Sequence, residues 1–123
     1  METAITNLVW PGRKVLCIQN GFFSARLAEM AERNGGEVSV YDVPLGEGAD
    51  PDQVEALLQS GGFDVLTIVQ GETSCTVWNQ QLASITRLAR KYNVLSVVDA
   101  VCTLSTMPLE MDNWQVDVVI TGG

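Results

Sequence analysis

The chain has 123 residues, 46% of them apolar, and a formal net charge of −8 from seven basic and fifteen acidic side chains. This composition predicts one globular domain with a core of its own, and it argues against nucleic acid as a partner because no basic cluster offsets the acidic surplus. The sequence has no histidine, which removes the most common metal ligand and the usual general base, so we expect no metal site.

Strand-like and helix-like patterns alternate along the sequence. Short apolar runs predict buried strands, and apolar residues at i, i+3 and i+4 predict helices. The connections are short, and no repeat or low-complexity tract interrupts them. The predicted elements are, in chain order, a strand at 14–19, a helix opened by Ser24 and ended by Gly35-Gly36, an outer strand at 37–41, a helix capped by Asp50-Pro51, a strand at 64–69, a helix ending near 91–93, a strand that begins at 94 and ends at Asp99, and a strand at 116–120.

This alternation predicts an α/β fold, a three-layer α/β/α arrangement in which helices cover both faces of a mainly parallel sheet. Residues 1–9 show helical spacing with no cap or strand before them, and the last strand runs directly into 121–123. We therefore interpret residues 1–123 as a single partial domain, the central part of a larger one.

The cysteines and the apolar segments indicate the compartment. Cys17, Cys75 and Cys102 form no CxxC pair, and their odd number does not suggest a disulfide framework, so a reducing compartment such as the cytoplasm fits best. No apolar stretch approaches the roughly 20 residues that cross a bilayer, and we expect no membrane association. A targeting segment for an organelle, ahead of residue 1, stays open as an alternative.

Asp99 is the residue that most favours a functional site. It closes the apolar run 94–98, so it stands where a buried parallel strand should end. Ligands of open α/β sheets bind in the crevice beyond the carboxyl ends of the strands. The alternative interpretation is that Asp99 only caps a helix or ends a strand.

Three predicted strands end in loops with distinctive side chains, which should meet at one edge of a parallel sheet. Residues 19–24 include two phenylalanines, residues 70–76 include Thr73 and Ser74, and Asp99 follows the next strand. An aromatic ring, a hydroxyl and a carboxylate suit a flat heteroaromatic cofactor with a basic ring nitrogen and a ring hydroxyl, such as pyridoxal phosphate. The phenylalanines also fit a core, and the hydroxyl cluster also fits a turn or a helix cap.

Seven short stretches share their order and spacing with one protein family. They are Pro11-Gly12-Arg13-Lys14-Val15-Leu16, Asn20-Gly21-Phe22-Phe23, Ala31-Glu32-Arg33-Asn34-Gly35, Gly71-Glu72-Thr73-Ser74, Val97-Val98-Asp99-Ala100-Val101, Pro108-Leu109 and Asp117-Val118-Val119-Ile120-Thr121-Gly122. With these residues the chain resembles class V aminotransferases of the alanine:glyoxylate and serine:pyruvate type, which have pyridoxal-phosphate fold type I. The resemblance makes it the central part of the large domain of such an enzyme.

The resemblance implies pyridoxal 5'-phosphate as the cofactor of the parent enzyme. It places Asp99 against the pyridine nitrogen, Thr73 against the ring hydroxyl, Phe23 on one face of the ring and Val101 on the other. A carboxylate paired with the ring nitrogen keeps that nitrogen protonated, so the ring accepts electrons from a substrate carbanion. The implied substrates are a small amino acid and a 2-oxo acid, glyoxylate or pyruvate, and the parent is expected to be a homodimer.

Two parts of the family's site fall outside the sequence. The resemblance implies that the Schiff-base lysine follows Gly123 and that a glycine-rich phosphate-binding turn precedes the first residue, and neither Lys14 nor Lys91 is a substitute. We therefore expect no catalytic residue in this chain, which by itself should be inactive and bind the cofactor weakly or not at all. Thr76 departs from the family, in which many relatives have glycine at this position.

Other interpretations stay open. Within the class, 2-aminoethylphosphonate and ureidoglycine transaminases fit the same residues. From a different class, a non-catalytic α/β binding or interaction module would keep the sheet without the chemistry. A Rossmann nucleotide binder is disfavoured because no GxGxxG follows any predicted strand.

Overall fold

A five-stranded parallel sheet forms the middle layer of the computed structural model, which describes residues 5, 7–44, 48–72, 77–78, 81–100 and 116–120. The strand order is β2-β1-β3-β6-β7, and every neighbouring pair is parallel. The strands of this sheet are β1 (Lys14–Gln19), β2 (Glu37–Asp42), β3 (Val65–Val69), β6 (Leu95–Asp99) and β7 (Val118–Ile120).

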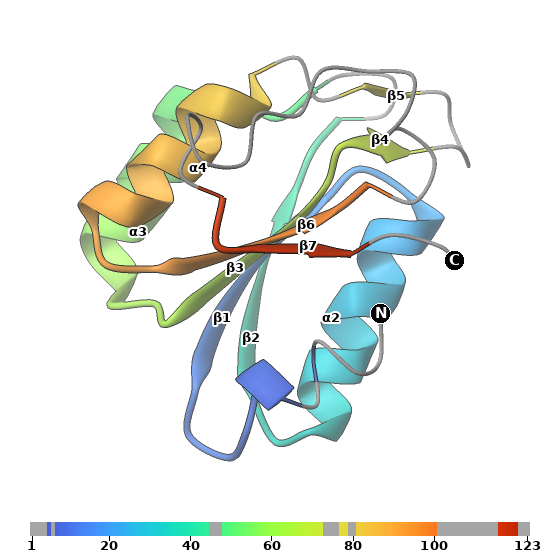
Figure 1. Ribbon diagram of the computed structural model, residues 1–123, viewed down its shortest axis with the longest axis vertical. Coiled ribbons are helices and arrows are strands. Elements are labelled where there is room, and N and C mark those ends of the chain that lie inside the picture. Colours follow the sequence, from blue (N-terminus) through green and yellow to red (C-terminus); the bar gives the residue numbers. More distant parts are fainter. Residues whose placement is uncertain are drawn as a thin grey trace.

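Helices cover both faces of the sheet. Among the described residues, the helices that pack on the sheet include α2 (Phe22–Arg33), α3 (Pro51–Gly61) and α4 (Leu82–Lys91). In Figure 1 the strands run through the middle of the molecule, with α2 on one side and α3 and α4 on the other. The predicted three-layer α/β/α arrangement is confirmed. Residues 5, 7 and 8 are also helical, as the spacing over 1–9 predicted.

Two apolar clusters fill the space between the layers. Because successive side chains of a strand point to opposite faces, each strand contributes to both clusters. The cluster between the sheet and α3 and α4 includes Leu16, Ile18, Val54, Leu58, Leu66, Ile68, Leu82, Ile85, Ala89 and Val98. The cluster between the sheet and α2 includes Ile5, Val9, Val15, Leu27, Ala31, Val65, Val69, Val97 and Ile120.

Local sequence explains where α3 begins and ends. The Asp50 carboxylate accepts a hydrogen bond from the Asp52 N–H at 3.0 Å, and Pro51 occupies the first turn, where its missing N–H costs nothing. Gly62 follows the helix with φ of 60°, a left-handed conformation that glycine adopts without strain. The predicted cap of this helix is therefore confirmed.

Two aspartates fix the beginnings of neighbouring strands. Asp64, just before β3, accepts the Lys14 N–H of β1 on its Oδ2 at 2.9 Å. Asp117, just before β7, accepts the Ser96 N–H of β6 on its Oδ2 at 3.0 Å, and its own N–H donates to Ser96 Oγ at 3.1 Å. Asp117 Oδ1 also pairs with Arg90 of α4 at 2.6 Å. Each carboxylate thus aligns two strands at the amino edge of the sheet.

The structure corrects several predicted boundaries. The last strand begins at Val118 and not at residue 116, and the strand predicted to begin at Val94 begins at Leu95, whereas its predicted end at Asp99 is confirmed. A two-stranded antiparallel hairpin, β4 (Gly71–Glu72) and β5 (Val77–Trp78), was not predicted, because two-residue strands show no periodicity. These differences leave the topology unchanged.

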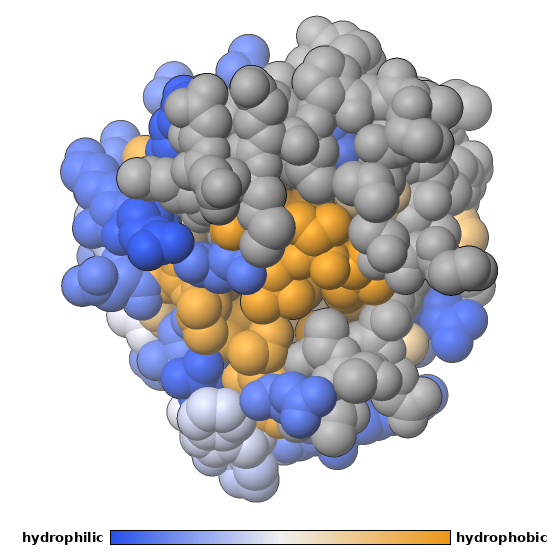
Figure 2. All heavy atoms as spheres, in the orientation of Figure 1, coloured by the Kyte–Doolittle hydropathy of each residue, from blue (hydrophilic) through white to orange (hydrophobic). Residues whose placement is uncertain are grey.

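The strand β7 lies at one edge of the sheet, and none of the other described strands pairs with its outer side. Val118 and Val119 are half-buried and belong to opposite clusters. Figure 2 shows apolar surface in the middle of the face on which β7 lies in Figure 1. Within the described ranges, no helix is long and apolar enough to cross a bilayer.

Candidate functional site

The carboxyl edge of the sheet has a point where the strand order reverses. From β1 the chain passes through α2 to β2 on one side, whereas from β3 it passes through α4 to β6 on the other side. The connections that follow β1 and β3 therefore diverge over opposite faces of the sheet. Such a reversal opens a crevice beyond the strand ends, and this is where open α/β sheets bind ligands.

Asp99 is the last residue of β6, two strands from β1 at this edge. Its register partners are Val69 of β3 and Ile120 of β7, and both belong to the cluster under α2. The Asp99 side chain therefore points to the α2 face of the sheet. Asp99 is only 4% exposed.

The backbone around Asp99 is fixed on both sides. The Gln70 N–H donates to the Asp99 carbonyl oxygen at 2.9 Å, which extends the pairing of β3 with β6 by one residue. The Ala100 N–H donates to the Ile120 carbonyl oxygen at 2.9 Å on the other side. Hydrogen bonds to both neighbouring strands thus fix the backbone of the residue that carries the carboxylate.

Phe23 occupies the first turn of α2, the helix that begins at the same carboxyl edge. Its half-buried ring packs against the cluster that includes Val69 and Ile120. The structure therefore places Phe23 and Asp99 on the same face and at the same end of the sheet. These are two of the four residues assigned to the cofactor by the resemblance.

The other two assigned residues, Thr73 and Val101, lie outside the described residues, as does Ser74. Both belong to connections that leave this edge, since Gly71 and Glu72 follow β3 and Ala100 follows β6. Their roles stay predictions.

Ser24 shapes the connection between β1 and α2 in a way that the sequence pattern did not indicate. The helix begins at Phe22 with Gly21 as its N-cap, so the expectation that Ser24 opens it was wrong by two residues. Ser24 Oγ instead accepts the N–H groups of Asn20 at 2.9 Å and Gly21 at 3.0 Å. A fully buried hydroxyl thereby holds the turn that positions Phe23.

Two buried amide side chains flank the reversal point. Asn20, directly after β1, is 5% exposed, and Gln70, directly after β3, is 1% exposed. Both make interactions with their surroundings. The sequence analysis assigned neither to the site, although a polar residue directly after an apolar strand was a usable signal.

Cys17 and Thr67 lie under α2, closer to the middle of the sheet than Asp99, and are partners in the β1–β3 register. Burial raises the pKa of the Cys17 thiol from 9.0 to about 11, and the Thr67 hydroxyl and the Ala28 backbone lower it in part. Thr67 Oγ1 makes no hydrogen bond of regular geometry to any of the described residues, so it acts on this pKa through its proximity to the thiol. The Cys17 Sγ donates to the Ser24 carbonyl oxygen at 3.3 Å. A neutral, buried thiol of this kind is not a nucleophile.

Both lysines of the sequence lie at the opposite, amino edge of the sheet. Lys14 begins β1, and its Nζ donates to the Gly61 carbonyl oxygen at 3.3 Å. Lys91 ends α4 and pairs with Glu55 of α3 at 3.1 Å. Neither amine lies at the edge that carries Asp99, as predicted from the sequence.

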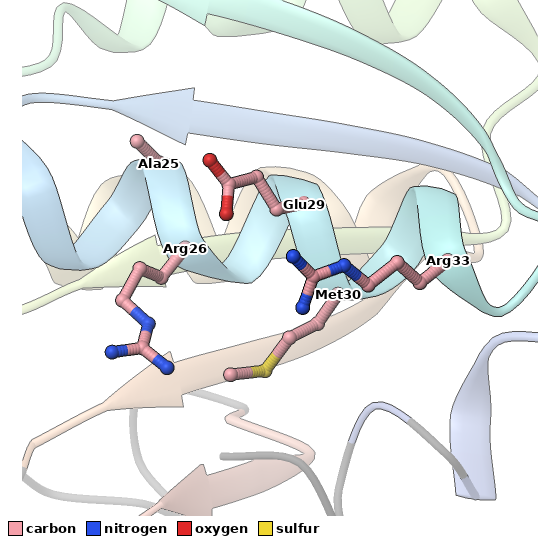
Figure 3. A pocket seen from close by; sticks show the side chains of 5 residues that line it. All are labelled: Ala25, Arg26, Glu29, Met30 and Arg33. Atoms are coloured by element: carbon pink, nitrogen blue, oxygen red, sulfur yellow. The ribbon is translucent and has the colours of Figure 1, made fainter.

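Two hollows are lined by described residues that include neither Asp99 nor Phe23. One lies along α2 and has a volume of about 320 Å³. In Figure 3 the Arg26 and Met30 side chains point to the side of α2 on which β6 and β7 lie. A second, open hollow of about 500 Å³ lies at the carboxyl ends of β1 and β2, and Asp42 is the one carboxylate among the described residues that line it. Among the described residues no group of three His, Cys, Asp or Glu side chains is arranged to hold a metal ion.

The described residues fit one side of a flat ring that has a basic nitrogen. A half-buried aromatic ring and a buried carboxylate share one face and one end of the sheet, next to the crevice. A carboxylate in apolar surroundings pairs strongly with a protonated ring nitrogen, and an aromatic side chain stacks on the ring itself. No described side chain at this edge is a general base of the histidine or lysine type.

Comparisons with known proteins extend these observations. The profile of the family described as Aminotransferase class-V matches residues 1–123. An L-aspartate–glyoxylate aminotransferase of Paracoccus denitrificans is 37% identical over 126 residues, which cover 98% of this chain and 32% of the relative. An alanine–glyoxylate aminotransferase of Drosophila melanogaster is 32% identical, with 99% of this chain and 31% of the relative covered. The chain thus spans about a third of the length of these relatives.

Solved structures agree with the sequence comparisons. A ureidoglycine–glyoxylate aminotransferase from Bacillus subtilis superposes with a TM-score of 0.94 at 29% identity, over 98% of this chain and 31% of that chain. An alanine–glyoxylate aminotransferase from Nostoc sp. superposes with a TM-score of 0.93 at 33% identity, over 98% of this chain and 32% of that chain.

Proposed function

The chain belongs to the class V aminotransferase family, and from this premise we propose that it carries the ring-binding edge of a pyridoxal-phosphate-dependent transaminase. The observation that carries the proposal is the placement of Asp99 and Phe23 on one face at the carboxyl edge, beside the reversal point of the sheet. The same edge begins the connections that contain Thr73 and Val101.

Each proposed residue has one physical role toward the ring. Asp99 holds a proton on the ring nitrogen through an ion pair, which is strong because the carboxylate is buried. Phe23 stacks on one face of the ring, Val101 packs on the other, and the Thr73 hydroxyl binds the ring oxygen. When bound, the cofactor supplies an electron-accepting ring that stabilises a carbanion at the Cα of an amino acid.

We propose that the whole protein transfers an amino group from a small amino acid to glyoxylate or pyruvate. Relatives named for alanine, aspartate and serine as donors share glyoxylate in their names, which supports glyoxylate as the acceptor. The donor would be selected by residues in the two thirds of the relatives that this chain does not span. A homodimeric parent and a cytoplasmic location belong to the same proposal.

The proposal predicts that this chain binds the cofactor ring weakly and without a covalent bond, because both lysines lie at the other edge. Pyridoxine is a suitable probe because it has the ring nitrogen and hydroxyl but no aldehyde that reacts with Lys14 or Lys91. We expect millimolar affinity by isothermal titration, and about tenfold weaker binding by Asp99→Asn, since that variant loses an ion pair worth about 1.4 kcal/mol.

The matched control is Asp42→Asn, which removes a carboxylate from the separate hollow after β2 and should leave the affinity unchanged. Equal weakening by both variants would show only a general effect of negative charge and would refute the assignment of Asp99.

A further inference from the structure

Three side chains lie next to one another across the carboxyl edge of the sheet on its α2 face. Val69 of β3 and Ile120 of β7 are the register partners of Asp99, one on each side of it. The three residues are 3%, 7% and 4% exposed, respectively. Neighbouring strands are about 4.8 Å apart, so methyl groups flank the carboxylate on both sides.

We propose that Val69 and Ile120 are positioning residues that keep the surroundings of the Asp99 carboxylate apolar on the two sides that they occupy. This inference rests on the proposed function. The two apolar side chains make Asp99 selective for a ligand ring that has a protonated nitrogen over a ring of the same shape without one.

The physical basis is the local dielectric. An ion pair between a carboxylate and a ring N–H⁺ strengthens several-fold when polar groups around it are replaced by hydrocarbon. A neutral ring without the nitrogen has no charge to pair with the carboxylate. Its affinity therefore does not increase when hydrocarbon replaces the polar groups around the carboxylate. Apolar flanks therefore increase the difference in affinity between the two rings.

Backbone hydrogen bonds fix the strands that carry Val69 and Ile120 relative to the strand that carries Asp99. The Gln70 N–H bonds to the Asp99 carbonyl oxygen and the Ala100 N–H bonds to the Ile120 carbonyl oxygen, both at 2.9 Å. The three strands cannot slide past one another at this edge without breaking these bonds. These bonds therefore fix the backbone of the two flanking strands relative to Asp99.

The sheet offers matched controls on the same face. Val65 belongs to β3 as Val69 does, is fully buried in the same cluster and pairs with Leu95 instead of Asp99. Val118 belongs to β7 as Ile120 does and pairs with Val97. Replacement of any of these residues by threonine keeps a β-branched side chain and adds a hydroxyl.

The experiment measures the affinity of the chain for pyridoxine and for its phenol analogue, in which C–H replaces the ring nitrogen. The ratio of the two affinities is insensitive to general loosening of the structure, which weakens both ligands. We expect Val69→Thr and Ile120→Thr each to lower this ratio about threefold, because the new hydroxyl donates to the carboxylate and competes with the ring nitrogen. Val65→Thr and Val118→Thr should leave the ratio within a factor of about 1.5.

The outcomes separate this inference from the proposed function. If all four variants change the ratio equally, the flanking residues have no special role and the inference is wrong, although Asp99 can still bind the ring. If the unsubstituted chain shows no preference for the nitrogen, or keeps it after Asp99→Asn, the proposed function itself fails and the inference fails with it.

Discussion

Cys17 shows at the scale of a single residue how burial changes chemistry under the site. Its thiol has a pKa raised to about 11 mainly by desolvation, against 9.0 when solvated. The thiol is protonated in both the folded and the unfolded chain below pH 9. Between pH 9 and about 11 the unfolded chain loses this proton and the folded chain keeps it, so stability is lost as the pH rises through this window.

We therefore predict that the free energy of unfolding falls by about 1.1 kcal/mol per pH unit in the middle of this window because of Cys17 alone. The measurement is urea unfolding from pH 8 to 11 on a chain whose other cysteines, Cys75 and Cys102, are replaced by serine. Cys17→Ala in that background should remove this part of the slope. Parallel curves for the two proteins would contradict the assigned cause.

The positions of candidate site residues at the carboxyl edge were predictable from the sequence for residues that follow a strand, and less so for residues that bond to the backbone. Asp99 and Phe23 were identified from the ends of apolar runs and from family stretches, and the structure places both at one edge. Ser24 and Gln70 were not identified as residues that shape this edge. Their hydrogen bonds depend on the path of the chain between elements, and this path leaves no periodic signal in the sequence.

At the scale of elements, the sheet depends on carboxylates that align strand beginnings. Asp117 accepts the Ser96 N–H and also pairs with Arg90, whose side chain is 53% exposed. The hydrogen bond to the backbone is half-buried, whereas the ion pair is largely solvated. We infer that the backbone bond contributes more to stability than the ion pair does.

Asp117→Ala should therefore lower the free energy of unfolding by about 1 to 3 kcal/mol, because it leaves the Ser96 N–H without its acceptor. Arg90→Gln removes only the ion pair and should cost less than about 1 kcal/mol. Urea unfolding measures both, and amide hydrogen exchange in β7 locates the loss. An equal loss in the free energy of unfolding for the two variants would show that Asp117 stabilises the fold through the ion pair and not through the alignment of β6 with β7.

The pattern of apolar residues predicted every strand of the main sheet, with shifts of one or two residues at their ends. The sequence suggested a continuous strand from residue 116, but β7 begins only at Val118. The reason is that Asp117 bonds to Ser96 of β6 through its carboxylate and its own N–H. The hairpin of β4 and β5 is too short to produce a pattern. Element type was thus predictable from periodicity, and element ends were set by side chains that bond to the backbone.

At the scale of the whole molecule, topology creates the site. Periodicity predicted a parallel sheet with helices on both faces, but it could not give the order β2-β1-β3-β6-β7, which depends on the direction of each crossover. That order places the reversal between β1 and β3 and brings the residues after β1, β3 and β6 to one crevice.

The most direct test of this account is to locate the bound ring by amide chemical shifts in the ¹⁵N-labelled chain during titration with pyridoxine. We expect the amides of Phe23, Gln70, Asp99 and Ala100 to shift together with one dissociation constant, and the amide of Lys14 at the amino edge to stay in place. Shifts confined to the amino edge or to the hollow after β2, or none at the highest soluble concentration, would contradict the assignment of the ring-binding edge.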